Sequence, residues 1–179
     1  MEDLLAFDND QIRILNQAVA IAEDLVSNAY KMSTSQWLHQ RYDIRTLKDL
    51  SPEEIIHGPF AQLVRYEGHR SGTALSSAAY DFYKICIMDH TILATVGQAS
   101  QLKLFPFVLY ISTHELIHIV RFSKFLAHFD TAPEDREAEE AQVHLHTRNI
   151  LEEVNIADID PVLAYYRNWQ IPFEGLKIT

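Results

Sequence analysis

The sequence contains little cysteine and no long apolar run. Cys86 is the one cysteine among 179 residues, so no internal disulfide can form and a small disulfide scaffold is excluded. The longest apolar run, from Leu104 to Ile111, is interrupted by Pro106 and is too short to span a membrane. Residues 1–4 lack the basic region that begins a signal peptide. These absences predict a protein of the reducing cytoplasm.

Positive charge is also scarce. Lysine and arginine total 15 against 25 aspartates and glutamates, which gives a formal net charge of −10. A surface of this sign repels phosphate groups, so we expect neither nucleic acid nor a membrane as a partner. The apolar fraction of 47% is enough for one sizeable core and predicts a single domain over residues 1–179. Nine histidines are many for this length and give the first indication of function.

The N-terminal third predicts helices. Apolar residues recur at three- and four-residue spacing between Asn9 and Tyr30, which is typical of a long amphipathic helix. A shorter helical stretch is expected from Gln36 to Tyr42. The segment 51–54 (Ser-Pro-Glu-Glu) combines an N-cap, a proline at the first helical position and a capping-box glutamate. It predicts a helix of one or two turns that ends before Gly58-Pro59.

The middle of the chain predicts a small antiparallel sheet. Aromatic and β-branched residues gather in short runs at 61–67 and 80–88, and each run is typical of a strand. Residues 68–72, which include two glycines, are the expected connection. Asp89-His90 is interpreted as a tight turn into a third strand over 91–96.

The C-terminal half predicts two long helices and an apolar tail. The first helix runs for about six turns from Pro106 towards residue 130. Thr131 with Glu134 forms a capping box that predicts a second helix to about Val154. The tail, 158–179, is too rich in aromatic residues to be free, so we expect it to pack on the domain or on a partner. It permits a homo-oligomer without requiring one.

One motif in the first of these helices carries specific chemistry. Residues 113–118 read Thr-His-Glu-Leu-Ile-His, an HExxH sequence. Side chains at i and i+4 of a helix stand one turn apart on one face, so His114 and His118 can bind a single metal ion. Glu115 is then placed to act as a general base on a water molecule that the metal activates.

The flanks of the motif predict that it is buried. On a helical wheel the motif shares one stripe with apolar and aromatic residues, namely Ile111, His114, Glu115, His118, Phe122, Phe125 and Phe129. Arg121, Lys124 and His128 lie on another face. The alternative is a pair of core histidines held by hydrogen bonds beside a buried glutamate. Three ionisable groups without water are costly unless a cation organises them, so metal binding is favoured.

The helix with this motif resembles the active-site helix of the zincin metallopeptidases, and the predicted order of elements is similar to theirs. The resemblance covers residues 107–154. It implies an α+β fold with a zincin-like core at about 61–154, a bound zinc ion, and hydrolysis of a peptide or protein substrate. In the gluzincin branch the third ligand is a glutamate on the following helix, with an acidic residue four positions later. The extended signature of the metzincins is absent.

Glu140 is the first choice for that third ligand. The apolar residues of the second helix define its core face, and Glu140 falls inside this arc while Glu137 lies just beyond it as an alternative. His144, where the family has an acidic residue, either orients His114 or Glu140 or is itself a ligand. A donor for the reaction's oxyanion could come from Tyr165, Tyr166 or His144.

The sequence therefore predicts a zinc-dependent hydrolase, with an extended peptide paired to an edge strand of the sheet. Two alternatives stay open. One is a metal-binding or interaction protein without catalysis, in which a fourth protein ligand such as His144 closes the site. The other is a helical di-iron protein, because Glu54 to His57 and Glu115 to His118 form two Glu-x-x-His pairs. The strand-like middle of the chain argues against the di-iron alternative, in which His114 would also have no role.

Overall fold

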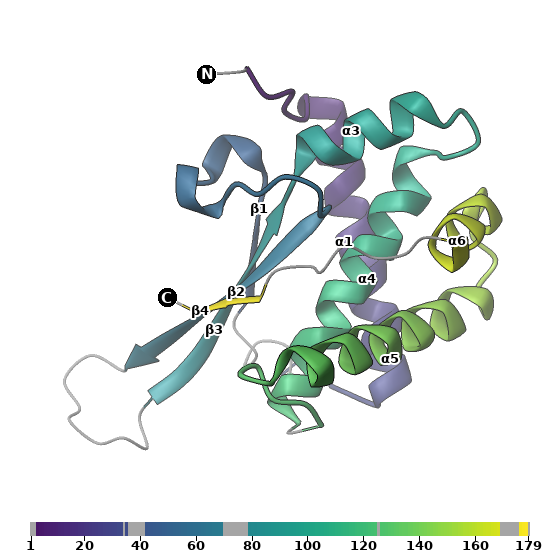
Figure 1. Cartoon of the computed structure of the whole chain (residues 1–179). Coiled ribbons are helices and arrows are strands. Elements are labelled where there is room, and N and C mark those ends of the chain that lie inside the picture. The colour runs from purple at the N-terminus through teal and green to yellow at the C-terminus, as the bar shows by residue number, and fades with distance from the viewer. Residues whose placement is uncertain are drawn as a thin grey trace.

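The fold places four packed helices on one side of a small sheet (Figure 1). The computed structural model describes residues 3–33, 35, 42–69, 79–124, 126–168 and 176–178. Helices α1, α5 and α6 pack around α4, which lies at the centre of the helical layer. The predicted α+β class is confirmed. Among the described residues, no helix combines the length and hydropathy that crossing a membrane would require.

Helix α1, Asn9–Tyr30, is the predicted N-terminal helix. It begins with a capping box in which the Asp8 carboxylate accepts from the Gln11 amide and the Gln11 side chain accepts from the Asp8 amide. It ends at Lys31, which adopts a left-handed conformation with φ of 53°. The buried stripe packs along α4 and consists of Leu15, Ala18, Ala22 and Val26.

The sheet has four strands in the order β1-β3-β2-β4. The two long central strands, β2 (Ala61–His69) and β3 (Ala79–Ile87), are the predicted antiparallel pair, with Leu63 opposite Ile85. Strand β1 (Tyr42–Arg45) pairs parallel with β3, and β4 (Leu176–Ile178) pairs parallel with β2. The sheet is therefore mixed, whereas the sequence predicted an antiparallel one. Both edge strands come from segments far from their partners in the chain, which local patterns cannot reveal.

Residues 89–98 form helix α3, Asp89–Gln98, so the predicted turn at Asp89-His90 and strand at 91–96 are wrong. The buried Asp89 carboxylate accepts hydrogen bonds from the amides of Phe7 and Leu47, which fixes the start of the helix against two distant segments. The β-branched residues at 91–96 favoured a strand locally. Tertiary contacts at Asp89 outweigh that weak preference.

Helix α4, Leu104–Ser123, carries the HExxH motif and is shorter than predicted. Every residue from Pro106 to Val120 is buried, so the helix passes through the middle of the protein. Helix α5, Pro133–Glu152, follows after a loop. Ala132, rather than Thr131, precedes its first turn, so the predicted capping box is wrong and Pro133 at the first position begins the helix instead.

The C-terminal tail packs on the domain as far as it is described. Helix α6, Ile159–Asn168, buries Ile159, Val162, Leu163 and Tyr166 against the core. Residues 169–175 lie outside the described part of the chain. So do Phe125 and residues 36–41 of the predicted short helix, while Tyr42, its last residue, lies in β1.

A second, smaller apolar cluster lies on the other face of the sheet, around Val64, Cys86 and Met88. A short 3₁₀ helix, Pro52–Glu54, packs here where the sequence predicted one or two helical turns. Its Glu54 Oε1 accepts from Lys84 Nζ at 2.6 Å and from the Tyr66 hydroxyl at 2.9 Å. Burial alone would raise the pKa of Glu54, but these bonds and the Ser51 amide lower it to about 2.

Replacing Glu54 with Gln should cost about 1–3 kcal/mol at pH 7, because Lys84 would lose its charged partner. A carboxyl with a lowered pKa stabilises the fold above its ordinary value of 4.5, and this contribution fades as the pH falls towards about 2. Urea unfolding of the metal-free proteins measures this. The free energies of unfolding of the wild type and Glu54→Gln should converge below pH 4. A constant difference at pH 7 and pH 3 would contradict this.

Candidate metal centre

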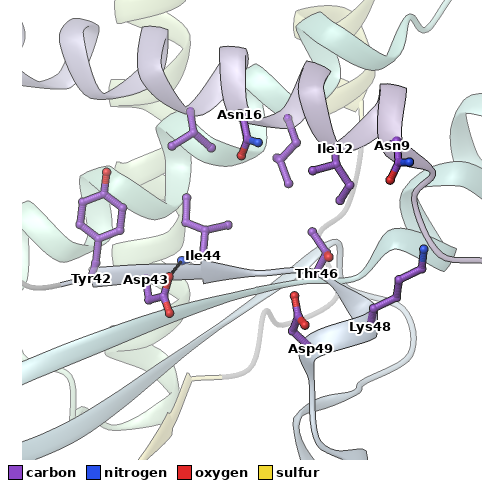
Figure 2. Close-up of a pocket in the computed structure, with 11 residues that line it drawn as sticks. Asn9, Ile12, Asn16, Tyr42, Asp43, Ile44, Thr46, Lys48 and Asp49 are labelled. Atoms are coloured by element: carbon purple, nitrogen blue, oxygen red, sulfur yellow. Dashed lines mark hydrogen bonds between the residues drawn. The ribbon is translucent and has the colours of Figure 1, made fainter.

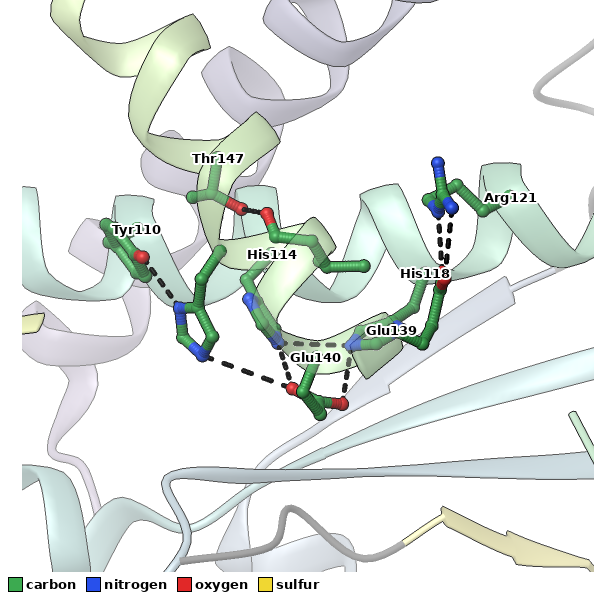
Figure 3. A network of polar contacts seen from close by, with 9 residues as sticks. Tyr110, His114, His118, Arg121, Glu139, Glu140 and Thr147 are labelled. Carbon is green, nitrogen blue, oxygen red and sulfur yellow. Dashed lines mark hydrogen bonds and ion pairs between the residues drawn. The ribbon is translucent and has the colours of Figure 1, made fainter. Parts of the chain in front are cut away.

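Helices α4 and α5 bring three ligating side chains together (Figure 3). His114 Nε2 and His118 Nε2 project from consecutive turns of α4 and lie 3.1 Å apart. Glu140, from the second turn of α5, places Oε2 3.1 Å from His114 Nε2 and Oε1 2.9 Å from His118 Nε2. Among the described residues, these three form the group whose ligating atoms all lie within 4.8 Å of one another.

The spacing of these atoms fits a divalent metal ion. A tetrahedral zinc ion with bonds of about 2.0–2.1 Å holds its ligand atoms about 3.3 Å apart, close to the separations observed here. Two imidazoles and one carboxylate are also the donor set that zinc accepts in sites that keep an open position. The side chains of His114, His118 and Glu140 are 2%, 1% and 9% exposed. A cation between them would offset the cost of burying a carboxylate in this place.

The two histidines lower the pKa of the Glu140 carboxyl. Burial alone would raise the pKa of its carboxyl, but His118 and His114 together outweigh burial and hold that pKa far below its usual range. The carboxylate is therefore ionised at neutral pH, which metal binding requires. The predicted choice of Glu140 over Glu137 is supported by position, since Glu137 is exposed and stands outside the group.

His144 lies next to Glu140, and Tyr110 contacts His144 from the side away from Glu140 Oε2. The Tyr110 hydroxyl is 2.7 Å from His144 Nδ1, and His144 Nε2 is 4.0 Å from Glu140 Oε2. Burial first, and the nearby His114 second, lower the pKa of His144 to about 2, so the imidazole is neutral. Tyr110 stacks on Tyr166 with ring centroids 3.8 Å apart. The sequence analysis missed Tyr110, although it stands one turn before His114 on the same helix.

A second contact between the helices was also missed. Arg121 Nε and Nη2 donate to the two carboxylate oxygens of Glu139 at 2.5 and 3.0 Å (Figure 3). The sequence analysis placed Arg121 on another face of its helix and gave it no partner. The ion pair lies next to Glu140 in the chain, so it fixes the N-terminal part of α5 against α4.

Breaking this ion pair should destabilise the protein without removing a ligand. Arg121→Met is expected to cost about 1–3 kcal/mol, because both side chains are largely buried and Glu139 would lose its bidentate partner. Urea denaturation measures the change. In a double-mutant cycle with Glu139→Gln, the two losses should not add. Additive losses would mean that the contact contributes nothing to stability.

The other predicted site residues lie in varied surroundings. Glu115 is 3% exposed and, within the described chain, stands outside the group of mutually close ligating atoms. Tyr166 is buried and Tyr165 is half-buried on α6. Glu54 bonds to Lys84 across the sheet, and the His57 ring packs against His90. The second Glu-x-x-His pair therefore takes no part in the metal centre, which argues against a di-iron site.

The sheet edge formed by β1 lies at a different place. A cavity of about 540 Å³ opens between α1 and β1, lined in part by Asn16, Tyr42 and Ile44 (Figure 2). The Asp43 carboxylate accepts a hydrogen bond from the Ile44 amide at 2.9 Å. This bond occupies one amide of the edge strand, and the pairing of an extended peptide with a sheet edge stays a prediction. None of the metal-ligating residues lines the cavity.

Comparison with protein-family models, with curated proteins and with solved structures gave no match.

Proposed function

We propose that the protein is a zinc-dependent hydrolase whose metal is held by His114, His118 and Glu140. The observation that carries the proposal is the convergence of these three buried groups from two helices, with the HExxH spacing on α4. A zinc ion bound there would supply Lewis acidity towards a carbonyl group and a water molecule made acidic enough to react at neutral pH.

The chain's own residues would do the remaining work. Glu115 follows the first ligand directly in the chain, and its carboxylate would accept the proton of the attacking water and pass it to the leaving amine. His114 and His118 are neutral imidazoles when they bind the ion, and Glu140 brings one negative charge. The aromatic wall of Tyr110 and Tyr166 excludes water from one side of the group.

A peptide or protein is the proposed substrate, on the strength of the resemblance to gluzincins. A cytoplasmic setting completes the proposal, since Cys86 is the one cysteine of the sequence and no internal disulfide can form.

Zinc-loaded protein should cleave peptides in a mixture of quenched fluorogenic peptides. Chelator treatment should abolish cleavage, and one equivalent of zinc should restore it, because the water molecule is not acidic enough without the ion. Glu140→Gln should cleave at least about 100-fold more slowly, because a neutral amide is a far weaker ligand. Cleavage that survives both the chelator and Glu140→Gln would contradict the proposal.

A second candidate is a metal-binding protein without catalysis. The specific observation that favours it is the burial of all three candidate side chains, none more than 9% exposed, which leaves little access for a large substrate. Binding of one zinc ion per chain, with no cleavage of any peptide in the mixture, would favour this candidate over the hydrolase.

A further inference from the structure

His144 presents a buried nitrogen to the metal centre. Its side chain is 8% exposed, and within the described chain Nε2 is fully buried with no hydrogen-bond partner. Glu140 Oε2 lies 4.0 Å from Nε2, which is too long for a hydrogen bond. A buried polar atom of this kind in a native protein calls for an explanation, such as a bound water molecule, ion or ligand.

The surroundings of the ring determine which nitrogen carries the proton. A neutral imidazole has one donor and one acceptor nitrogen, and the Tyr110 hydroxyl lies 2.7 Å from Nδ1. A phenol hydroxyl that donates to Nδ1 leaves the proton on Nε2, so Nε2 becomes a donor. The opposite tautomer would aim the Nε2 lone pair at the Glu140 carboxylate, which is unfavourable. Tyr110 therefore sets His144 as a donor that faces the metal centre.

The position of His144 fits a hydrogen-bond donor better than a metal ligand. The three proposed ligands have atoms 2.9–3.1 Å apart, whereas His144 stands outside the group whose atoms lie within 4.8 Å of one another. At this distance Nε2 is placed to donate to an oxygen atom of a bound ligand rather than to hold the ion itself. Such an oxygen would gain most from the bond if it were negatively charged.

We propose that His144 donates from Nε2 to an anionic oxygen of the ligand that this centre binds, such as a carboxylate, and that Tyr110 fixes the donor tautomer. The inference rests on the proposed metal centre and adds the residues that recognise what binds beside the metal. His144 would be the anion donor and Tyr110 a positioning residue.

Acetate binding to the cobalt-loaded protein tests this inference without requiring catalysis. Cobalt(II) occupies zinc sites of this donor set and gives a visible spectrum that reports added ligands. Titration with acetate should shift that spectrum in the wild-type protein. His144→Phe should raise the Kd for acetate about tenfold or more, because a hydrogen bond to a charged group is lost. Its affinity for cobalt should fall by no more than about tenfold, the low end of what replacing a neighbour of the ligands costs.

Three further variants control for structure. Tyr110→Phe keeps the aromatic ring but removes the hydroxyl, and should weaken acetate about threefold or more. His144→Gln restores an N–H donor near the position of Nε2. It should therefore bind acetate more tightly than His144→Phe does. His128→Gln replaces an exposed histidine and should bind acetate like the wild type.

Three outcomes would overturn the inference. Equal Kd values for acetate in the wild type and His144→Phe would show that Nε2 donates to no bound anion. A wild-type spectrum insensitive to acetate, with a loss of cobalt affinity above about 100-fold in His144→Phe, would make His144 a fourth ligand. Failure of the wild-type protein to bind cobalt or zinc at all would refute the metal centre itself, and the inference with it.

Discussion

Zinc should raise the melting temperature of chelator-treated protein by about 10 °C. An ion that binds only the folded state at about 1,000 times its Kd contributes about 4 kcal/mol. Each kcal/mol shifts the melting temperature of a chain of this length by about 2–4 °C. The expected shift is large because the unfolded chain does not hold His118 and Glu140 together.

His118→Ala should remove this zinc-dependent shift, since two remaining ligands bind zinc weakly. Differential scanning calorimetry with and without zinc measures it, and the comparison uses the shift in each variant, so any change in the stability of the metal-free protein cancels. His128→Gln, which alters an exposed histidine, should keep the full shift. If zinc does not change the melting temperature of the wild-type protein, the proposed metal centre is contradicted.

Glu115→Gln should separate metal binding from turnover. The substitution keeps the size of the side chain and removes its basicity, so the variant should still show the zinc-dependent shift. Turnover of any peptide cleaved by the wild type should fall by about 10²–10⁴-fold, which is the usual contribution of a general base. The expected drop is in kcat, because the carboxylate acts on the reacting water rather than on the bound substrate.

Glu137→Gln is the matched control, because it makes the same chemical change at an exposed carboxylate of α5. Its turnover should equal that of the wild type. If Glu115→Gln cleaves peptides as fast as the wild type does, Glu115 has no part in the mechanism.

The convergence of the three candidate ligands was largely predictable, because each argument for it concerns a single helix. The four-residue spacing of His114 and His118 places both on one helix face wherever that helix lies. Glu140 followed from the apolar pattern of its own helix, which defines the face turned to the core. Both arguments need only the identity of a helix, which is the most dependable inference from periodicity.

The support around the centre was less predictable. Tyr110 contacts His144 across 34 positions of the sequence, and Arg121 contacts Glu139 across 18. The wheel placed Arg121 on a face away from the HExxH stripe, and a charged residue there is usually exposed. Complementary pairing allows such a residue to be largely buried, and one sequence does not reveal its partner.

The sheet shows the same limit. The central pair β2 and β3 was predicted from β-branched and aromatic runs joined by a short connection. The edge strand β1 is four residues long and pairs with β3 across about forty positions, too short and too distant for a local signal. At 91–96 the same β-branched signal was misleading, since tertiary contacts at Asp89 start a helix there.

Zinc-edge anomalous diffraction from crystals grown with zinc tests the central claim most directly. The account predicts one peak per chain, about 2.0–2.2 Å from His114 Nε2, His118 Nε2 and a Glu140 oxygen. A map with no peak there, or with zinc bound only at other side chains, would contradict it. The three groups would then be a hydrogen-bonded core cluster rather than a metal centre.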